Sequence, residues 1–143
     1  MHVVSDALTV LLRIVAVAQL AIAALNLALP RVMRWTEDLA RLPLLIREVF
    51  HVHAWFISAT LGIFGVLTLR FAGEMTAGAN PVCHWLAGAI GLFWAIRTVL
   101  QVTYYSASHW RGRPFRTVLH IVALATYGIL ALVYLLAAFR GGV

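Results

Sequence analysis

The chain has 143 residues, of which 63% are hydrophobic and only 11% are charged. This composition, with a mean hydropathy of +0.93, excludes a soluble globular domain and indicates an integral membrane protein. The chain contains no lysine, so arginines supply the positive side of its net charge of +6. The single cysteine, Cys83, excludes an internal disulfide and any CxxC motif. We therefore expect the lipid bilayer, and no nucleic acid, as the main surroundings of this protein.

Four apolar runs, in chain order, predict a single domain (1–143) with four membrane spans at about 7–29, 49–71, 82–105 and 115–139. Each run is long enough to cross a hydrocarbon core of roughly 30 Å. The first run ends at Pro30, and it lacks the basic start and the small-residue cleavage pattern of a signal peptide. The expected fold class is an all-α integral membrane protein, an antiparallel up-down four-helix transmembrane bundle.

The connections between the spans differ in charge. Residues 31–48 carry four arginines and residues 106–116 carry three, whereas residues 72–81 carry none. Because positive loops favour the cytoplasm, we expect a multi-pass inner-membrane protein with both termini on the non-cytoplasmic side. In the first connection, Thr36 is expected to cap a short interfacial helix, with Glu37 and Asp38 in its first turn and Pro43 ending it.

Polar residues recur at seven-residue steps inside the apolar runs, and this recurrence predicts one face of each helix in a left-handed bundle. We call these faces the polar seam. It predicts a shared inward chamber on the cytoplasmic half of the membrane. The seam consists of Gln19 and Asn26 in the first span, His51 and Ser58 in the second, Arg97, Gln101 and Tyr104 in the third, and Arg113, His120, Tyr127 and Tyr134 around the fourth.

Arg97 is the residue that most needs an explanation. A cation near the bilayer centre costs about 2.5 to 17 kcal/mol, depending on the measure, and usually faces a partner or a wet cavity. The acidic residues all lie outside the predicted spans. We expect Arg97 and Gln101 to bind a haem propionate, a quinone carbonyl or a lipid phosphate, with Tyr104 and Tyr127 as supporting donors. The alternative is that Arg97 snorkels to the interface or bonds to Gln101, Tyr104 and backbone carbonyls.

Two histidines offer a second kind of site. His51 and His120 are predicted at similar depth on diagonal helices, a placement that suits the axial ligands of a haem b. Helix-to-helix hydrogen bonding by the same histidines is the main alternative. A non-haem metal site formed with His109 and Glu48 is another. Trp94 is expected to pack in the core, with stacking on a ring ligand as the alternative.

A small four-span bundle with histidines and an arginine on one side resembles, in architecture, the membrane anchors of quinone-reactive oxidoreductases that hold haem b. That resemblance implies a haem b or quinone-binding redox subunit, with Gln19 and Asn26 contributing to the pocket. Two other hypotheses remain open. One is a non-catalytic subunit or assembly factor of a larger membrane complex, and the other is a small carrier or enzyme for a lipid-soluble anionic substrate.

Overall fold

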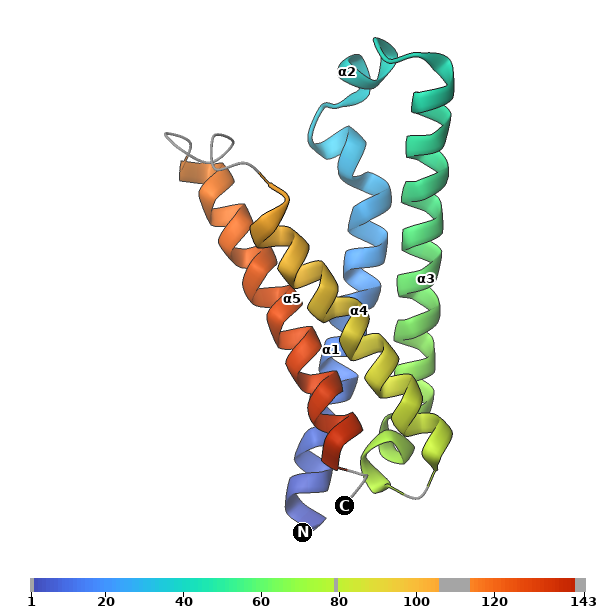
Figure 1. Ribbon diagram of the computed structural model, residues 1–143, viewed down its shortest axis with the longest axis vertical. Coiled ribbons are helices and arrows are strands. Elements are labelled where there is room, and N and C mark those ends of the chain that lie inside the picture. Colours follow the sequence, from blue (N-terminus) through green and yellow to red (C-terminus); the bar gives the residue numbers. More distant parts are fainter. Residues whose placement is uncertain (1, 79, 106–113, 141–143) are drawn as a thin grey trace. The chain divides into compact units, whose positions relative to one another are not determined.

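The computed structural model describes residues 2–78, 80–105 and 114–140, and these residues form helices and short connections without any strand. In chain order the helices are α1 (His2–Val32), α2 (Thr36–Ala40), α3 (Leu44–Ala77), α4 (Pro81–Thr103) and α5 (Pro114–Arg140) (Figure 1). Within the described ranges, α1, α3, α4 and α5 are long and apolar enough to cross a membrane. The predicted all-α membrane class, with a short helix between the first two spans, is therefore confirmed.

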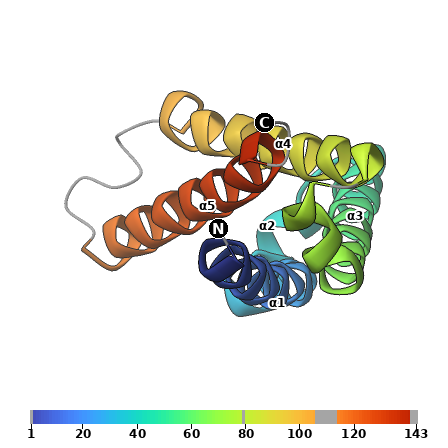
Figure 2. The same ribbon diagram turned by 90° about the horizontal axis from the view of Figure 1, so that it is seen from below.

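The chain divides into two compact units. One consists of Arg13–Arg70, and we call it the α1–α3 unit; the other joins Met1–Leu12 to Phe71–Val143, and we call it the α4–α5 unit. Inside each unit, long antiparallel helices pack as they do in helical bundles, and both pairs can be followed in two views (Figures 1 and 2). The chamber shared by all four spans stays a prediction, because each unit is described by itself.

In the α1–α3 unit, the two long helices are joined by polar side chains and by one close approach. The amide of Asn26 donates from α1 to the Ala54 carbonyl oxygen at 3.1 Å and to Ser58 Oγ at 2.9 Å. Further along, a Cβ on Gly65 would lie 2.7 Å from Leu20 Cγ, so no larger residue fits there without movement. Gly65 therefore allows α1 and α3 to pack closely at this level.

In the α4–α5 unit, α4 begins with an N-capping residue followed by a proline. The Asn80 side chain accepts a hydrogen bond from the Val82 amide, and Pro81 occupies the first helical position, where its missing N–H costs nothing. Gly91 lets α5 approach, because a Cβ there would lie 2.9 Å from Leu135 Cγ. This hairpin of α4 and α5 carries the candidate site described below.

Three helix ends differ from the expectations from the sequence. Pro30 does not end α1, which continues to Val32, because a proline near a helix terminus removes only one hydrogen bond. The residue at the N-cap position of α2 is Trp35, so Thr36 is the first helical residue and caps nothing. Helix α4 ends at Thr103, earlier than the predicted span.

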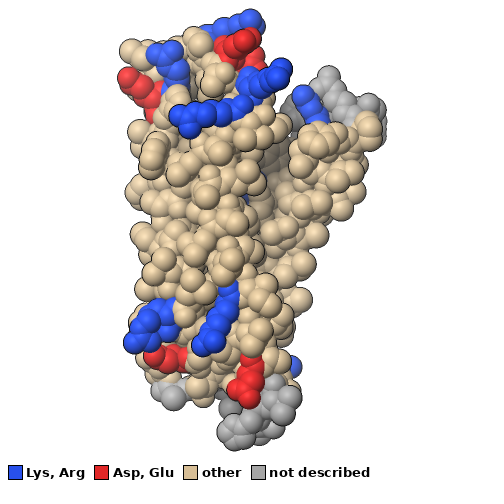
Figure 3. Space-filling view, turned by 180° about the vertical axis from the view of Figure 1, so that it is seen from behind, with Lys and Arg blue, Asp and Glu red and all other residues tan. Residues whose placement is uncertain are grey.

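The surface has the charge distribution of a membrane protein. In the α1–α3 unit, charged side chains gather around α2 and the adjoining ends of α1 and α3, beyond an apolar stretch (Figure 3). Large apolar side chains such as Phe56, which is 74% exposed, and Trp85, which is 80% exposed, point outward from the helices. Such exposure would be unfavourable in water but is expected for side chains that face lipid.

Candidate functional site

A chain of two hydrogen bonds connects three polar side chains of α4 and α5. Arg97 and Gln101 stand one turn apart on the same face of α4, and Arg97 Nη1 donates to Gln101 Oε1 at 2.8 Å. The other end of the same amide, Gln101 Nε2, lies 2.9 Å from His120 Nδ1 on α5. Gln101 is only 5% exposed, whereas Arg97 and His120 are half-buried. The buried amide thus holds the cation and the imidazole at its two ends.

Aromatic rings surround this chain. Tyr127 of α5 stacks on Trp94 of α4, with ring centroids 5.3 Å apart and an interplanar angle of 26°. The guanidinium carbon of Arg97 lies 4.7 Å from the Tyr127 centroid and 5.9 Å from the Tyr105 centroid, within the range of cation–π attraction. Trp94 is 1% exposed, so it packs in the core as expected. The rings shield one side of the cation from lipid and fix its orientation.

Arg97 lies nearer the end of its helix than the midplane position that the sequence predicts. It stands six residues before Thr103, the last residue of α4, which is about 9 Å along the axis at about 1.5 Å per residue. Among the described residues, no carboxylate forms an ion pair with Arg97. Guanidinium has several N–H donors and no acceptor, and Gln101 uses one of those donors. The site therefore has donor capacity for a ligand that brings oxygen acceptors.

Of the two adjacent tyrosines at the end of α4, Tyr105 lies near Arg97 and Tyr104 does not. Tyr104 is 81% exposed and meets only the edge of Tyr105 in the described contacts, at 6.1 Å between centroids. Tyr104 still has helical backbone angles, and its N–H donates to the Leu100 carbonyl oxygen. The seven-residue step from Arg97 therefore gives the position of Tyr104 along the helix but not the contacts of its side chain, and the step passes over Tyr105.

Gln19 and Asn26, which were expected in the same pocket, belong to the α1–α3 unit. Gln19 is fully buried, and its Nε2 donates to the Leu61 carbonyl oxygen at 3.3 Å. Asn26 bonds to the Ala54 carbonyl and to Ser58. These amides satisfy groups of the neighbouring helix, so within this unit they act as interhelical hydrogen-bonding groups.

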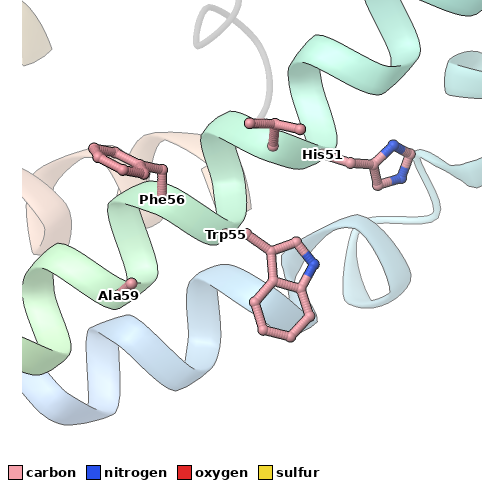
Figure 4. Close-up of a pocket in the computed structure, with 5 residues that line it drawn as sticks. His51, Trp55, Phe56 and Ala59 are labelled. Atoms are coloured by element: carbon pink, nitrogen blue, oxygen red, sulfur yellow. The ribbon is translucent and has the colours of Figure 1, made fainter.

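His51 lies on an exposed face of α3, although Ser58, seven residues further along the same helix, is only 5% exposed. Because Asn26 reaches Ala54 and Ser58, His51 is level with the last turn of α1, where little of that helix remains to cover it. Its Nδ1 lies 2.7 Å from the Arg47 carbonyl oxygen and donates to it. His51 lines an open groove of about 400 Å³ on α3 (Figure 4); the other lining residues are Val52, Trp55, Phe56 and Ala59.

The residues expected as metal ligands form no metal-binding cluster in the described part of the chain. Within the described ranges, no three His, Cys, Asp or Glu residues lie close enough to hold a metal ion. His109 and Arg113, which the sequence placed in the metal site and the seam, lie outside the described residues. Sequence reasoning passed over His84 of α4, whose ring nitrogens are buried and have no hydrogen-bond partner in the described part of the chain.

Comparison with known proteins adds no further constraint on this site. No protein-family model, curated protein or solved structure matches this chain.

Proposed function

We propose that this multi-pass membrane protein is a quinone-binding redox subunit, and that Arg97, Gln101 and His120 form the site for the quinone head. Tyr127 flanks that site. By the distribution of arginines in the loops, the site belongs to the cytoplasmic half of a bacterial-type inner membrane, with both chain termini on the opposite side. The redox partner would be another subunit of a membrane complex.

The observation that carries the proposal is the Arg97–Gln101–His120 hydrogen-bond chain beside a stacked aromatic pair. A quinone head is flat and apolar, with carbonyl oxygens that accept hydrogen bonds. A guanidinium and an imidazole supply donors to such oxygens, and the neighbouring rings supply flat contact surface. Because the site lies about 9 Å from the end of α4, the isoprenoid tail of a quinone would remain among lipid chains.

The haem b hypothesis stays a prediction. It requires His51 and His120 as a pair of axial ligands, and these residues belong to different units, whereas the quinone hypothesis uses residues that contact one another within one unit. His51 does have the side-chain arrangement of many ligating histidines, because its Nδ1 donates to a backbone carbonyl. A Soret band in the purified protein, lost in His51→Ala or His120→Ala, would establish the haem version.

A lipid-soluble anionic substrate is the second candidate, and the lack of an acidic partner for Arg97 among the described residues favours it. The interhelical bonds of Gln19 and Asn26 favour a third candidate, a non-catalytic subunit whose polar groups specify helix pairing. The three candidates differ in what the purified chain should bind: a quinone, an anionic amphiphile or neither.

The test is a calorimetric titration of the protein in lipid nanodiscs with a short-chain benzoquinone. Arg97→Met removes the cation at the site, and Arg13→Met is the matched control, because Arg13 is an exposed arginine outside this site. A hydrogen bond to a charged group contributes about 1.5 to 3 kcal/mol, so Arg97→Met should weaken binding by about tenfold or more. Arg13→Met should leave it unchanged. Undetectable binding to the wild type, or equal binding by Arg97→Met, would overturn the proposal.

Titration with an anionic amphiphile of similar length separates the second candidate from the first. A quinone-specific site should bind the benzoquinone at least about tenfold more tightly, a difference of about 1.4 kcal/mol. The reverse order of affinities would replace the quinone by the anionic substrate. If neither ligand binds, the non-catalytic hypothesis remains.

A further inference from the structure

The orientation of the Gln101 amide follows from the chemistry of Arg97. An arginine side chain only donates hydrogen bonds, so the atom of Gln101 that faces Arg97 Nη1 at 2.8 Å must be the carbonyl oxygen. The amide nitrogen then faces α5. This assignment does not depend on distinguishing nitrogen from oxygen by position, because the opposite orientation would bring two donors together.

The same reasoning continues to the imidazole. The Gln101 amide nitrogen carries hydrogens and no acceptor lone pair, and it lies 2.9 Å from His120 Nδ1. That ring nitrogen must therefore accept the hydrogen bond, so it carries no proton. In the neutral ring the proton is on Nε2, which makes Nε2 a donor.

We infer that Gln101 is a positioning residue that holds His120 in the Nε2–H tautomer, so that neither the Arg97 guanidinium nor the second ring nitrogen of His120 is a hydrogen-bond acceptor. Resting on the proposed function, this inference assigns a redox preference to the site: the oxidised quinone, with two carbonyl acceptors, binds more tightly than the quinol. A quinol brings hydroxyl hydrogens, and neither Arg97 nor the Nε2–H group of His120 accepts them.

Burial makes this arrangement stable. Gln101 is 5% exposed, so water does not readily replace either of its hydrogen bonds. Reversing the amide would bring its NH2 group against the Arg97 donor and its oxygen against the unprotonated Nδ1, so both hydrogen bonds would be lost. Rotation of the Arg97 guanidinium is also limited, since it lies against the Tyr127 ring at 4.7 Å. The arginine, fixed by the aromatic ring, thus sets the tautomer of a histidine on another helix.

The direct test is ¹⁵N NMR of histidine-labelled protein in nanodiscs, with His120 assigned by its missing signal in His120→Phe. The two nitrogens of a neutral imidazole give distinct signals, because only one of them carries a proton. The wild type should show a protonated Nε2 and an unprotonated Nδ1. A proton on Nδ1 in the unliganded wild type would overturn the inference without any variant.

Two substitutions show whether Gln101 is the cause. Gln101→Glu places a carboxylate, which only accepts, opposite Nδ1, so the His120 proton should move to Nδ1. Gln101→Leu removes the amide, and the two tautomers should then mix. The matched control is Thr98→Val, since the Thr98 hydroxyl donates within its own helix, to the Trp94 carbonyl oxygen. A His120 spectrum that is unchanged in both Gln101 variants would show that the Gln101 amide does not determine the His120 tautomer.

The ligand preference is measured by titrating the wild type and Gln101→Glu with the benzoquinone and with its quinol. The wild type should prefer the quinone by about tenfold, or about 1.4 kcal/mol, and Gln101→Glu should lose that preference. Equal affinities in the wild type would refute the redox preference even if the tautomer is as inferred. No binding of either form would refute the proposed function, whereas the NMR result would still decide the role of Gln101.

Discussion

The side-chain amide of Gln101 on α4 lies 2.9 Å from the ring nitrogen Nδ1 of His120 on α5 and connects the two helices through buried polar groups. Residues that share one hydrogen bond do not contribute independently to stability. The Gln101→Leu and His120→Phe variants, together with their combination, should give a coupling free energy of about 0.5 to 2 kcal/mol. Reversible unfolding in mixed micelles measures it, and strictly additive effects would contradict the contact.

Asn26→Leu should destabilise the α1–α3 unit. It removes hydrogen bonds to the Ala54 carbonyl and to Ser58 Oγ, and such interhelical bonds contribute about 0.6 kcal/mol on average and up to about 1.7 in membranes. The free energy of unfolding should fall by about 1 to 3 kcal/mol. The control is Thr60→Val, because the Thr60 hydroxyl bonds within its own helix, to the Phe56 carbonyl. An equal effect of both substitutions would argue against the interhelical role of Asn26.

Gly65→Ala should be markedly worse than Gly62→Ala, although the two glycines lie one turn apart on α3. A methyl group at Gly65 would lie 2.7 Å from Leu20 Cγ and 3.2 Å from the Ala16 carbonyl oxygen, whereas nothing lies within 4 Å of one at Gly62. Overpacking costs about 1 to 3 kcal/mol, and an unobstructed Gly→Ala change in a helix gains up to about 1 kcal/mol. Thermal unfolding of both variants checks the ranking, and similar melting temperatures would contradict it.

The predicted sidedness can be tested with single cysteines in a Cys83→Ser background. Thr36→Cys lies in α2 and Ala77→Cys at the end of α3, and both positions are exposed. In bacterial spheroplasts, a membrane-impermeant maleimide should label Ala77→Cys only. Thr36→Cys should react after the membrane is permeabilised. Labelling of Thr36→Cys in intact spheroplasts would reverse the topology and place the candidate site in the outer half of the membrane.

Hydropathy and charge were enough to predict the four long helices. Long apolar runs have few stable conformations in lipid, because every backbone hydrogen bond must be made internally. The helices extend beyond the predicted spans at several ends: α3 begins at Leu44 and continues to Ala77, past its apolar part. Hydropathy marks where lipid contact ends, whereas the helix continues until its backbone conformation changes, as it does after Ala77 at Gly78, where φ is 75°.

The candidate site was predicted in part. Arg97, Gln101 and His120, which the sequence analysis expected on inward faces, are joined by hydrogen bonds in the structure. The seven-residue repeat covers Arg97 and His120, whereas Gln101 stands one helical turn from Arg97. The repeat pointed to Tyr104, which is 81% exposed, and gave no signal for Tyr105, whose ring lies 5.9 Å from the Arg97 guanidinium carbon. It also assigned His51 to a covered face, since periodicity does not show where the neighbouring helix stops.

Photolabelling with an azidoquinone tests the central claim most directly. The protein in nanodiscs is irradiated with the probe, digested and analysed by mass spectrometry, with excess unmodified quinone as competitor. If Arg97, Gln101 and His120 bind the quinone head, competed label should appear in peptides that contain residues 94–105 and 120–127. Label confined to residues 13–70, or label that excess quinone does not displace, would contradict a quinone site between α4 and α5.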